Sequence, residues 1–149
     1  MHPNTALYEQ DFFAWTQTTA AMLRAGKWHE VDMEAIAEEL ESMGRSQKRE
    51  LDSRLEVLVM HLLKWRYQPD RREDSHSWYD TILEQRGQIA RLLADNPSLH
   101  PHVPALLTAG YLHARRRAIG ETHPGTAVFP EAGPWTVLQI LDMDFWPDA

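Results

Sequence analysis

Residues 32–67 read DMEAIAEELESMGRSQKRELDSRLEVLVMHLLKWRY, and this stretch decides the fold class. Its apolar side chains recur at steps of three and four residues, which places them on one side of a helix with 3.6 residues per turn. They are Met33, Ile36, Ala37, Leu40, Met43, Leu51, Leu55, Leu58, Val59, Leu62 and Leu63. The two-residue alternation of a strand does not fit this spacing. The sequence therefore predicts one long helix at the centre of an all-α protein.

Signals for the start of this helix and for a bend lie within the same stretch. Asp32 is a residue type that caps the amino-terminal end of helices. Gly44 lies inside the helix and costs about 1 kcal/mol relative to alanine. A glycine at this place predicts a bend or a close helix crossing.

Three further helices are expected, over residues 9–25, 77–95 and 99–119. Gly26, the pair Asn96-Pro97 and Gly120 mark their ends. The break between the long helix and the next one is short, so these two helices should pack antiparallel, with His61 near Ile82 and Gln85.

The carboxyl-terminal tail is too apolar to remain in water. It carries Phe129, Trp135, Leu138, Ile140, Leu141, Phe145 and Trp146. We expect a short helix between Gly133 and Asp142 and a tail docked on the other helices. The predicted architecture is a single-domain helical bundle over residues 1–149, with four main helices, a short C-terminal helix and a docked aromatic tail. Residues 1–7 could lack order.

Composition limits the function classes. The chain has 149 residues, no cysteine and a formal charge of −7. The missing cysteines exclude disulfides and thiolate chemistry, and the negative charge argues against binding to nucleic acid. No signal peptide is visible and no apolar stretch is long enough to span a membrane. The sequence predicts a soluble cytoplasmic protein.

Eight histidines raise the question of a metal site. His61 lies at the edge of the apolar stripe. A histidine in such a position more often makes one structural hydrogen bond; the alternative is that it binds a metal ion or transfers protons. A site formed by His61, His76 and His113 is conceivable. Bundle metal sites, however, need two Glu-x-x-His motifs on apolar faces, and the sequence has one, Glu73 to His76, in the polar break. No metal and no cofactor is predicted.

A polar pocket is the first place to look for a site. Gln85 is expected to face inward, and an unpaired buried amide costs about 1–3 kcal/mol, so it needs partners. Glu84 and Arg86 flank it. Together with residues of the facing helix they form the candidate set His61, Trp65, Tyr67, Glu84, Gln85 and Arg86. A network that fixes the helix register is the structural alternative.

The same residues carry a family resemblance. The motifs are Tyr8-x-x-Asp11-Phe12-x-x-Trp15, Leu23-Arg24-x-Gly26-x-Trp28, the run 37–44, His61-Leu62-Leu63-Lys64-Trp65 with Tyr67-Gln68-Pro69, Glu84-Gln85-Arg86, and the ending from Phe129-Pro130 to Asp144-Phe145-Trp146-Pro147. In this combination the chain resembles the bacterial family called domain of unknown function twenty-nine. The resemblance implies a small helical bacterial protein and adds no catalytic residue, ligand or cofactor.

Two functional hypotheses remain open. The first is a noncatalytic interaction or regulatory module. It would bind another protein or a second copy of the chain through an exposed helix face. It predicts an apolar surface patch. The alternative is a small metal- or phosphate-handling enzyme with its site near His61. It predicts that charged groups converge on this histidine.

Overall fold

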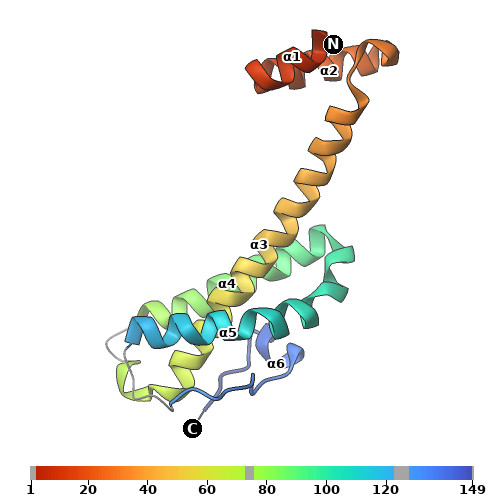
Figure 1. Cartoon of the computed structure of the whole chain (residues 1–149). Coiled ribbons are helices and arrows are strands. Elements are labelled where there is room, and N and C mark those ends of the chain that lie inside the picture. Colours follow the sequence, from red (N-terminus) through yellow and green to blue (C-terminus); the bar gives the residue numbers. More distant parts are fainter. Residues whose placement is uncertain (1–2, 73–75, 123–127, 149) are drawn as a thin grey trace. The chain divides into compact units, whose positions relative to one another are not determined.

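The computed structural model describes residues 3–72, 76–122 and 128–148, and these contain helices and irregular segments without any strand (Figure 1). The predicted all-α class is confirmed. The chain divides into two compact units, residues 1–46 and 47–149, and the division falls within the long helix α3, Met33–Tyr67. We call them the amino-terminal and carboxyl-terminal units and describe each by itself.

The amino-terminal unit begins with two helices in place of the one expected over residues 9–25. They are α1 (Pro3–Gln10) and α2 (Phe12–Arg24). The break falls at Asp11, whose carboxylate accepts a hydrogen bond of 3.0 Å from Ala14 N and so caps α2. Gly26 follows α2 with a positive φ of 73°, as a glycine after a helix end should. A short turn, η1 (Trp28–Glu30), leads to α3.

Asn4 lies in the segment 1–7, for which a lack of order was considered, and it connects α1 to α2 and to Asp32. Its side chain is buried and donates to Thr19 Oγ1 at 3.0 Å. Its carbonyl oxygen accepts from the indole N–H of Trp15 and from the backbone N–H of Asp32, both at 3.0 Å. Asp32 in turn caps α3 through Ala35 N at 3.1 Å, as predicted. A buried amide with three hydrogen bonds holds α1 in place.

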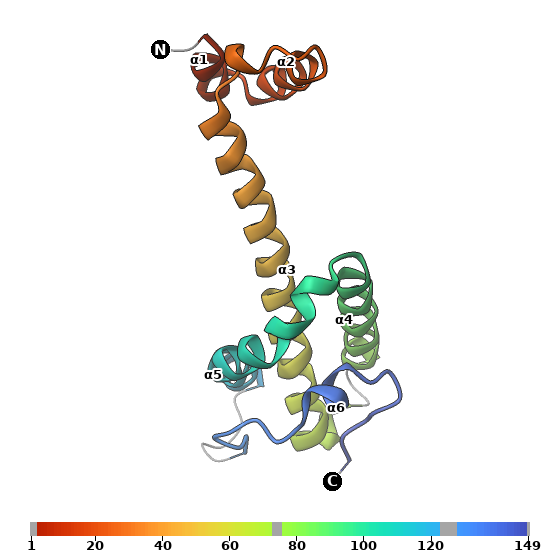
Figure 2. The ribbon, with the colours of Figure 1, turned by 90° about the vertical axis from the view of Figure 1, so that its right-hand side faces the viewer.

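The carboxyl-terminal unit is built on the second half of α3. It adds α4 (His76–Asp95), η3 (Pro97–His102), α5 (Val103–Thr122) and α6 (Val137–Leu141), with the turn η2 (Pro69–Arg71) after α3. Figure 1 shows α4 running back along α3, as predicted, and Figure 2 shows α4 and α5 on either side of this part of α3. The core between them contains Leu51, Leu55, Leu58, Leu62, Leu63, Ile82, Ile89, Val103, Ala114 and Ala118.

The long apolar stripe is buried along one part of α3 and exposed along the other. Leu51 and Leu58 are 0% exposed, whereas Leu40 is 64% and Met43 63% exposed. The first three turns of the stripe are therefore not part of this core. α3 continues through Gly44, and a Cβ built there would meet no atom of the described residues within 4 Å, so the predicted close crossing is not found.

The tail is docked, as predicted. Phe129 is 2% and Ile140 5% exposed. Thr136 and Gln139 form a reciprocal capping box that starts α6, with bonds of 3.2 and 2.9 Å. The short helix thus begins and ends within the range 133–142 that the sequence indicated.

Candidate functional site

Arg86 is the central polar residue of the carboxyl-terminal unit. Its side chain is 1% exposed, on the inward side of α4. The guanidinium donates from Nε to Ile140 O at 2.8 Å, from Nη1 to Phe145 O at 2.8 Å and from Nη2 to Gln139 O at 3.2 Å. Burial lowers the pKa of Arg86, and the nearby Asp142 opposes this shift. The arginine thereby satisfies two carbonyl groups at the end of α6 that have no partner within so short a helix, and a third carbonyl group in the segment after it.

Trp146 is the aromatic residue of the tail that contacts Arg86. Its ring stacks on Tyr79 with the centroids 4.7 Å apart and the planes at 6°, and it lies 4.9 Å from the ring of Trp65. The guanidinium carbon of Arg86 lies 5.6 Å from the Trp146 ring. On the far side of the stack, Arg72 lies 4.6 Å from Trp65 and donates to its carbonyl at 2.6 Å. These contacts attach the end of the chain to α3 and α4.

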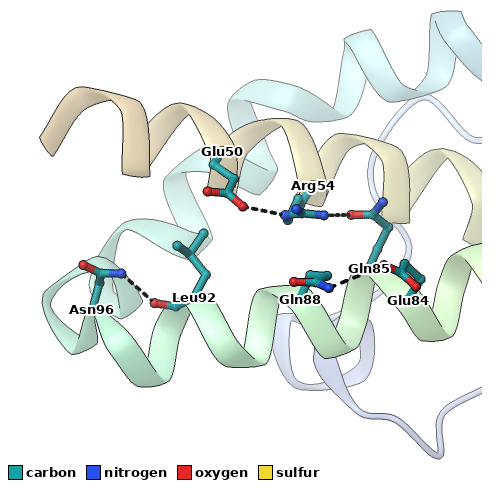
Figure 3. Close-up of polar contacts among 7 residues, drawn as sticks. All are labelled: Glu50, Arg54, Glu84, Gln85, Gln88, Leu92 and Asn96. Carbon is teal, nitrogen blue, oxygen red and sulfur yellow. Dashed lines mark hydrogen bonds and ion pairs between the residues drawn. The ribbon is translucent and has the colours of Figure 1, made fainter. Parts of the chain in front are cut away.

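Gln85, which was expected to face inward, is half-buried, and its side chain is bonded to the facing helix α3. Figure 3 shows Arg54 between Glu50 and Gln85, with hydrogen bonds of 3.0 and 3.3 Å. Glu84 is exposed and accepts from Gln88 at 3.4 Å. The neighbouring Arg86 takes the inward position, because its long side chain reaches three carbonyl acceptors there.

His61 is part of another set of contacts. Its Nδ1 lies 2.8 Å from Val57 O, and the charges that act on it come from Lys64, Glu121 and Arg117. Lys64 is buried and donates to Glu121 at 2.6 Å. In the described part of the chain no three histidine, aspartate or glutamate side chains are placed to hold a metal ion.

The structure therefore brings together two of the six predicted site residues. Trp65 and Arg86 meet at the ring of Trp146, while Tyr67 lies edge-on to Phe129 with the ring centroids 6.1 Å apart. His61, Glu84 and Gln85 each contact other residues. Trp146 was not part of the predicted set, although its place in the apolar tail that was expected to dock was a signal for it.

The interaction hypothesis predicted an exposed apolar face but not its place, and such a face lies in the amino-terminal unit. It consists of Met33, Ile36, Leu40 and Met43, which lie on one side of α3 at steps of three and four residues; we call it the α3 apolar face. Ile36 is half-buried and the other three are more than half exposed. Ala35, on another side of α3, is 5% exposed, and contacts to this part of α3 come from α1.

Tyr8 of α1 contacts α3 at Glu39, the residue before Leu40. Its hydroxyl donates to Glu39, and this hydrogen bond raises the pKa of Tyr8 to about 12. Its ring packs edge-on against Phe12, with the centroids 6.0 Å apart. Phe12 is itself 50% exposed, so α2 also carries exposed apolar surface.

His61 gives a prediction for the pH dependence of stability. Burial lowers its pKa from the ordinary value of 6.5, so the unfolded chain binds more protons than the folded one just below this pH. Stability should therefore fall as the pH drops below 6.5, and His61→Gln should reduce that fall. Urea unfolding across this range measures the effect, with the exposed His113→Gln as the control. An unchanged slope in His61→Gln would contradict the prediction.

The fold and the contacts define a class: an all-α protein whose carboxyl-terminal tail is bound by a buried arginine. The chain belongs to the family described as Domain of unknown function DUF29, whose sequence model matches residues 7–146. The predicted membership is confirmed. Searches of curated proteins and of solved structures find no match to this chain. None of the described helices has the length and apolar character to cross a membrane.

Proposed function

We propose that the chain is a noncatalytic protein-interaction module whose α3 apolar face binds an amphipathic, basic helix of a partner protein. The observation that carries the proposal is the exposure of Met33 (54%), Leu40 (64%) and Met43 (63%) along three turns of one helix. Large apolar side chains in a row are typical of interaction surfaces, and their spacing suits a second helix laid along the first.

The charge of the amino-terminal unit favours a basic partner. Residues 1–46 contain eight Asp and Glu and three Lys and Arg, a net charge of −5 out of −7 for the whole chain. Glu34, Glu38 and Glu41 lie on the same turns of α3 as the apolar face. A partner helix with lysine and arginine beside its apolar residues would be attracted to this surface, whereas a second copy would bring acidic groups near one another.

The alternative function, a metal- or phosphate-handling enzyme near His61, has no specific observation in its favour. The ring nitrogen Nδ1 is hydrogen-bonded to Val57 O, and the neighbouring Lys64 and Glu121 form an ion pair with each other. We further propose a bacterial cytoplasmic protein, which the family resemblance and the composition without cysteine support.

A designed amphipathic peptide of leucine and lysine tests the proposed surface. We expect the fluorescently labelled peptide to bind, with an affinity that falls as salt is added, since the attraction is partly electrostatic. Leu40→Ser should weaken binding about tenfold or more, because a buried leucine contributes about 1.5–3 kcal/mol. Fluorescence anisotropy measures both effects.

Leu138→Ser is the matched control, since Leu138 is 83% exposed but belongs to the other unit. It should leave the affinity unchanged. Equal binding of the same peptide with glutamate in place of lysine would contradict the choice of a basic partner. If sedimentation shows a dimer that Leu40→Ser dissociates, a second copy covers this face and the proposed partner is wrong.

A further inference from the structure

A pocket of about 530 Å³ lies within the carboxyl-terminal unit, between α5 and the segment that leads into α6. Its walls are mainly apolar and include Val59, Leu107, Leu112, Val137 and Ile140. This volume falls in the range of about 300–1,000 Å³ that is typical of sites for small molecules. The pocket shares no residue with the α3 apolar face, so a ligand bound in it is independent of the proposed function.

The wall formed by residues 131–137 is attached at both ends. Before it, the hydroxyl of Tyr111 donates to Pro130 O at 2.7 Å, and Arg115 donates from Nε and Nη2 to Phe129 O at 3.2 and 3.1 Å. After it, the capping box of Thr136 and Gln139 starts α6. The pocket is therefore present without a ligand, and binding needs little ordering of the chain.

This wall lies close to α5 at Gly133. A Cβ built at this position would lie 3.4 Å from Cδ2 of Tyr111. The ring of Tyr111 is buried, and burial raises its pKa to about 12, so the hydroxyl stays protonated and bonded to Pro130 O. Tyr111 thus serves as a fixed part of the pocket wall.

The groups available for recognition favour a cation. Glu131 is the charged residue among those that line the pocket, and it makes no ion pair within the described part of the chain. Trp135 also lines the pocket and stacks on no other aromatic ring of the described residues. The hydroxyl of Thr108, by contrast, is directed to Pro104 O at 3.0 Å. A carboxylate and an indole ring both attract positive charge.

We propose that this pocket binds a small hydrophobic organic cation, with an ammonium or guanidinium group joined to a hydrocarbon body. The hydrocarbon packs against Leu107, Leu112 and Val137, and the cationic group lies between the Glu131 carboxylate and the Trp135 ring. The carboxylate selects the charge, and the apolar walls exclude strongly hydrated inorganic cations.

Three probes with the same hydrocarbon test the proposal: phenylbutylammonium, phenylbutanol and phenylbutyrate. We expect saturable amide shifts in two-dimensional NMR at Leu112 and Val137 with the ammonium compound, weaker binding of the alcohol and weakest binding of the carboxylate. Glu131→Gln should lower the affinity for the ammonium compound about tenfold and leave that for the alcohol unchanged. Trp135→Leu should lower the preference for the cation.

Asp95→Asn is the control, because Asp95 is an exposed acid of the same unit outside the pocket. It should change neither affinity. The proposal is overturned if the alcohol binds as tightly as the ammonium compound, or if Glu131→Gln and Asp95→Asn have equal effects. Shifts at other residues, or no saturable binding of any of the three probes, overturn the pocket itself.

Discussion

Replacing Arg86 with methionine should lower the free energy of unfolding of the carboxyl-terminal unit by about 4 kcal/mol. The methionine keeps most of the apolar stem but removes the donors to Gln139 O, Ile140 O and Phe145 O. It also removes the cation over the ring of Trp146. Urea unfolding followed by circular dichroism measures the loss.

Two further variants define the origin of this effect. Arg86→Lys keeps a positive charge, but a single ammonium group cannot match the geometry of the three carbonyls, so its stability should fall between wild type and Arg86→Met. Arg91→Met changes an exposed arginine of the same helix and should alter stability by less than about 0.5 kcal/mol. Equal losses in Arg91→Met and Arg86→Met would show that the contacts to the tail do not stabilise the unit.

Leu58→Ala should destabilise the carboxyl-terminal unit by about 3 kcal/mol, because Leu58 is 0% exposed and its removal leaves a cavity in the core. Leu138→Ala, at an exposed site of the same unit, should cost less than about 0.5 kcal/mol. The same unfolding experiment measures both. A small effect of Leu58→Ala would mean that the apolar stripe of α3 does not form the core.

Leu40→Ala extends this comparison to the exposed part of the stripe. Leu40 and Leu58 have equivalent places in the sequence pattern, but Leu40 is 64% exposed. Its truncation should therefore change the free energy of unfolding by less than about 0.5 kcal/mol, although Leu40→Ser should weaken binding of the basic peptide. Loss of binding without loss of stability distinguishes a docking residue from a core residue.

The candidate site was predicted less well than the fold. Trp65 and Arg86 were in the predicted set, and both contact the tail through Trp146. Helical periodicity alone could not choose between Gln85 and Arg86 for the inward position, since neighbouring residues differ by about 100° and both lie near the edge of the apolar side. The carbonyl groups that bind Arg86 belong to residues more than fifty positions later in the chain, and they decide the choice.

The sequence by itself determined the local features: the helical class, the capping of α3 by Asp32, the end of α2 at Gly26 and the need to bury an aromatic tail. Each follows from interactions among residues a few positions apart or from the cost of exposing apolar surface. The tertiary structure alone decided which part of the α3 stripe is covered, how Arg86 is bonded and where a pocket forms. These depend on contacts between distant segments, and a periodic pattern shows that a side of a helix is apolar but not what packs against it.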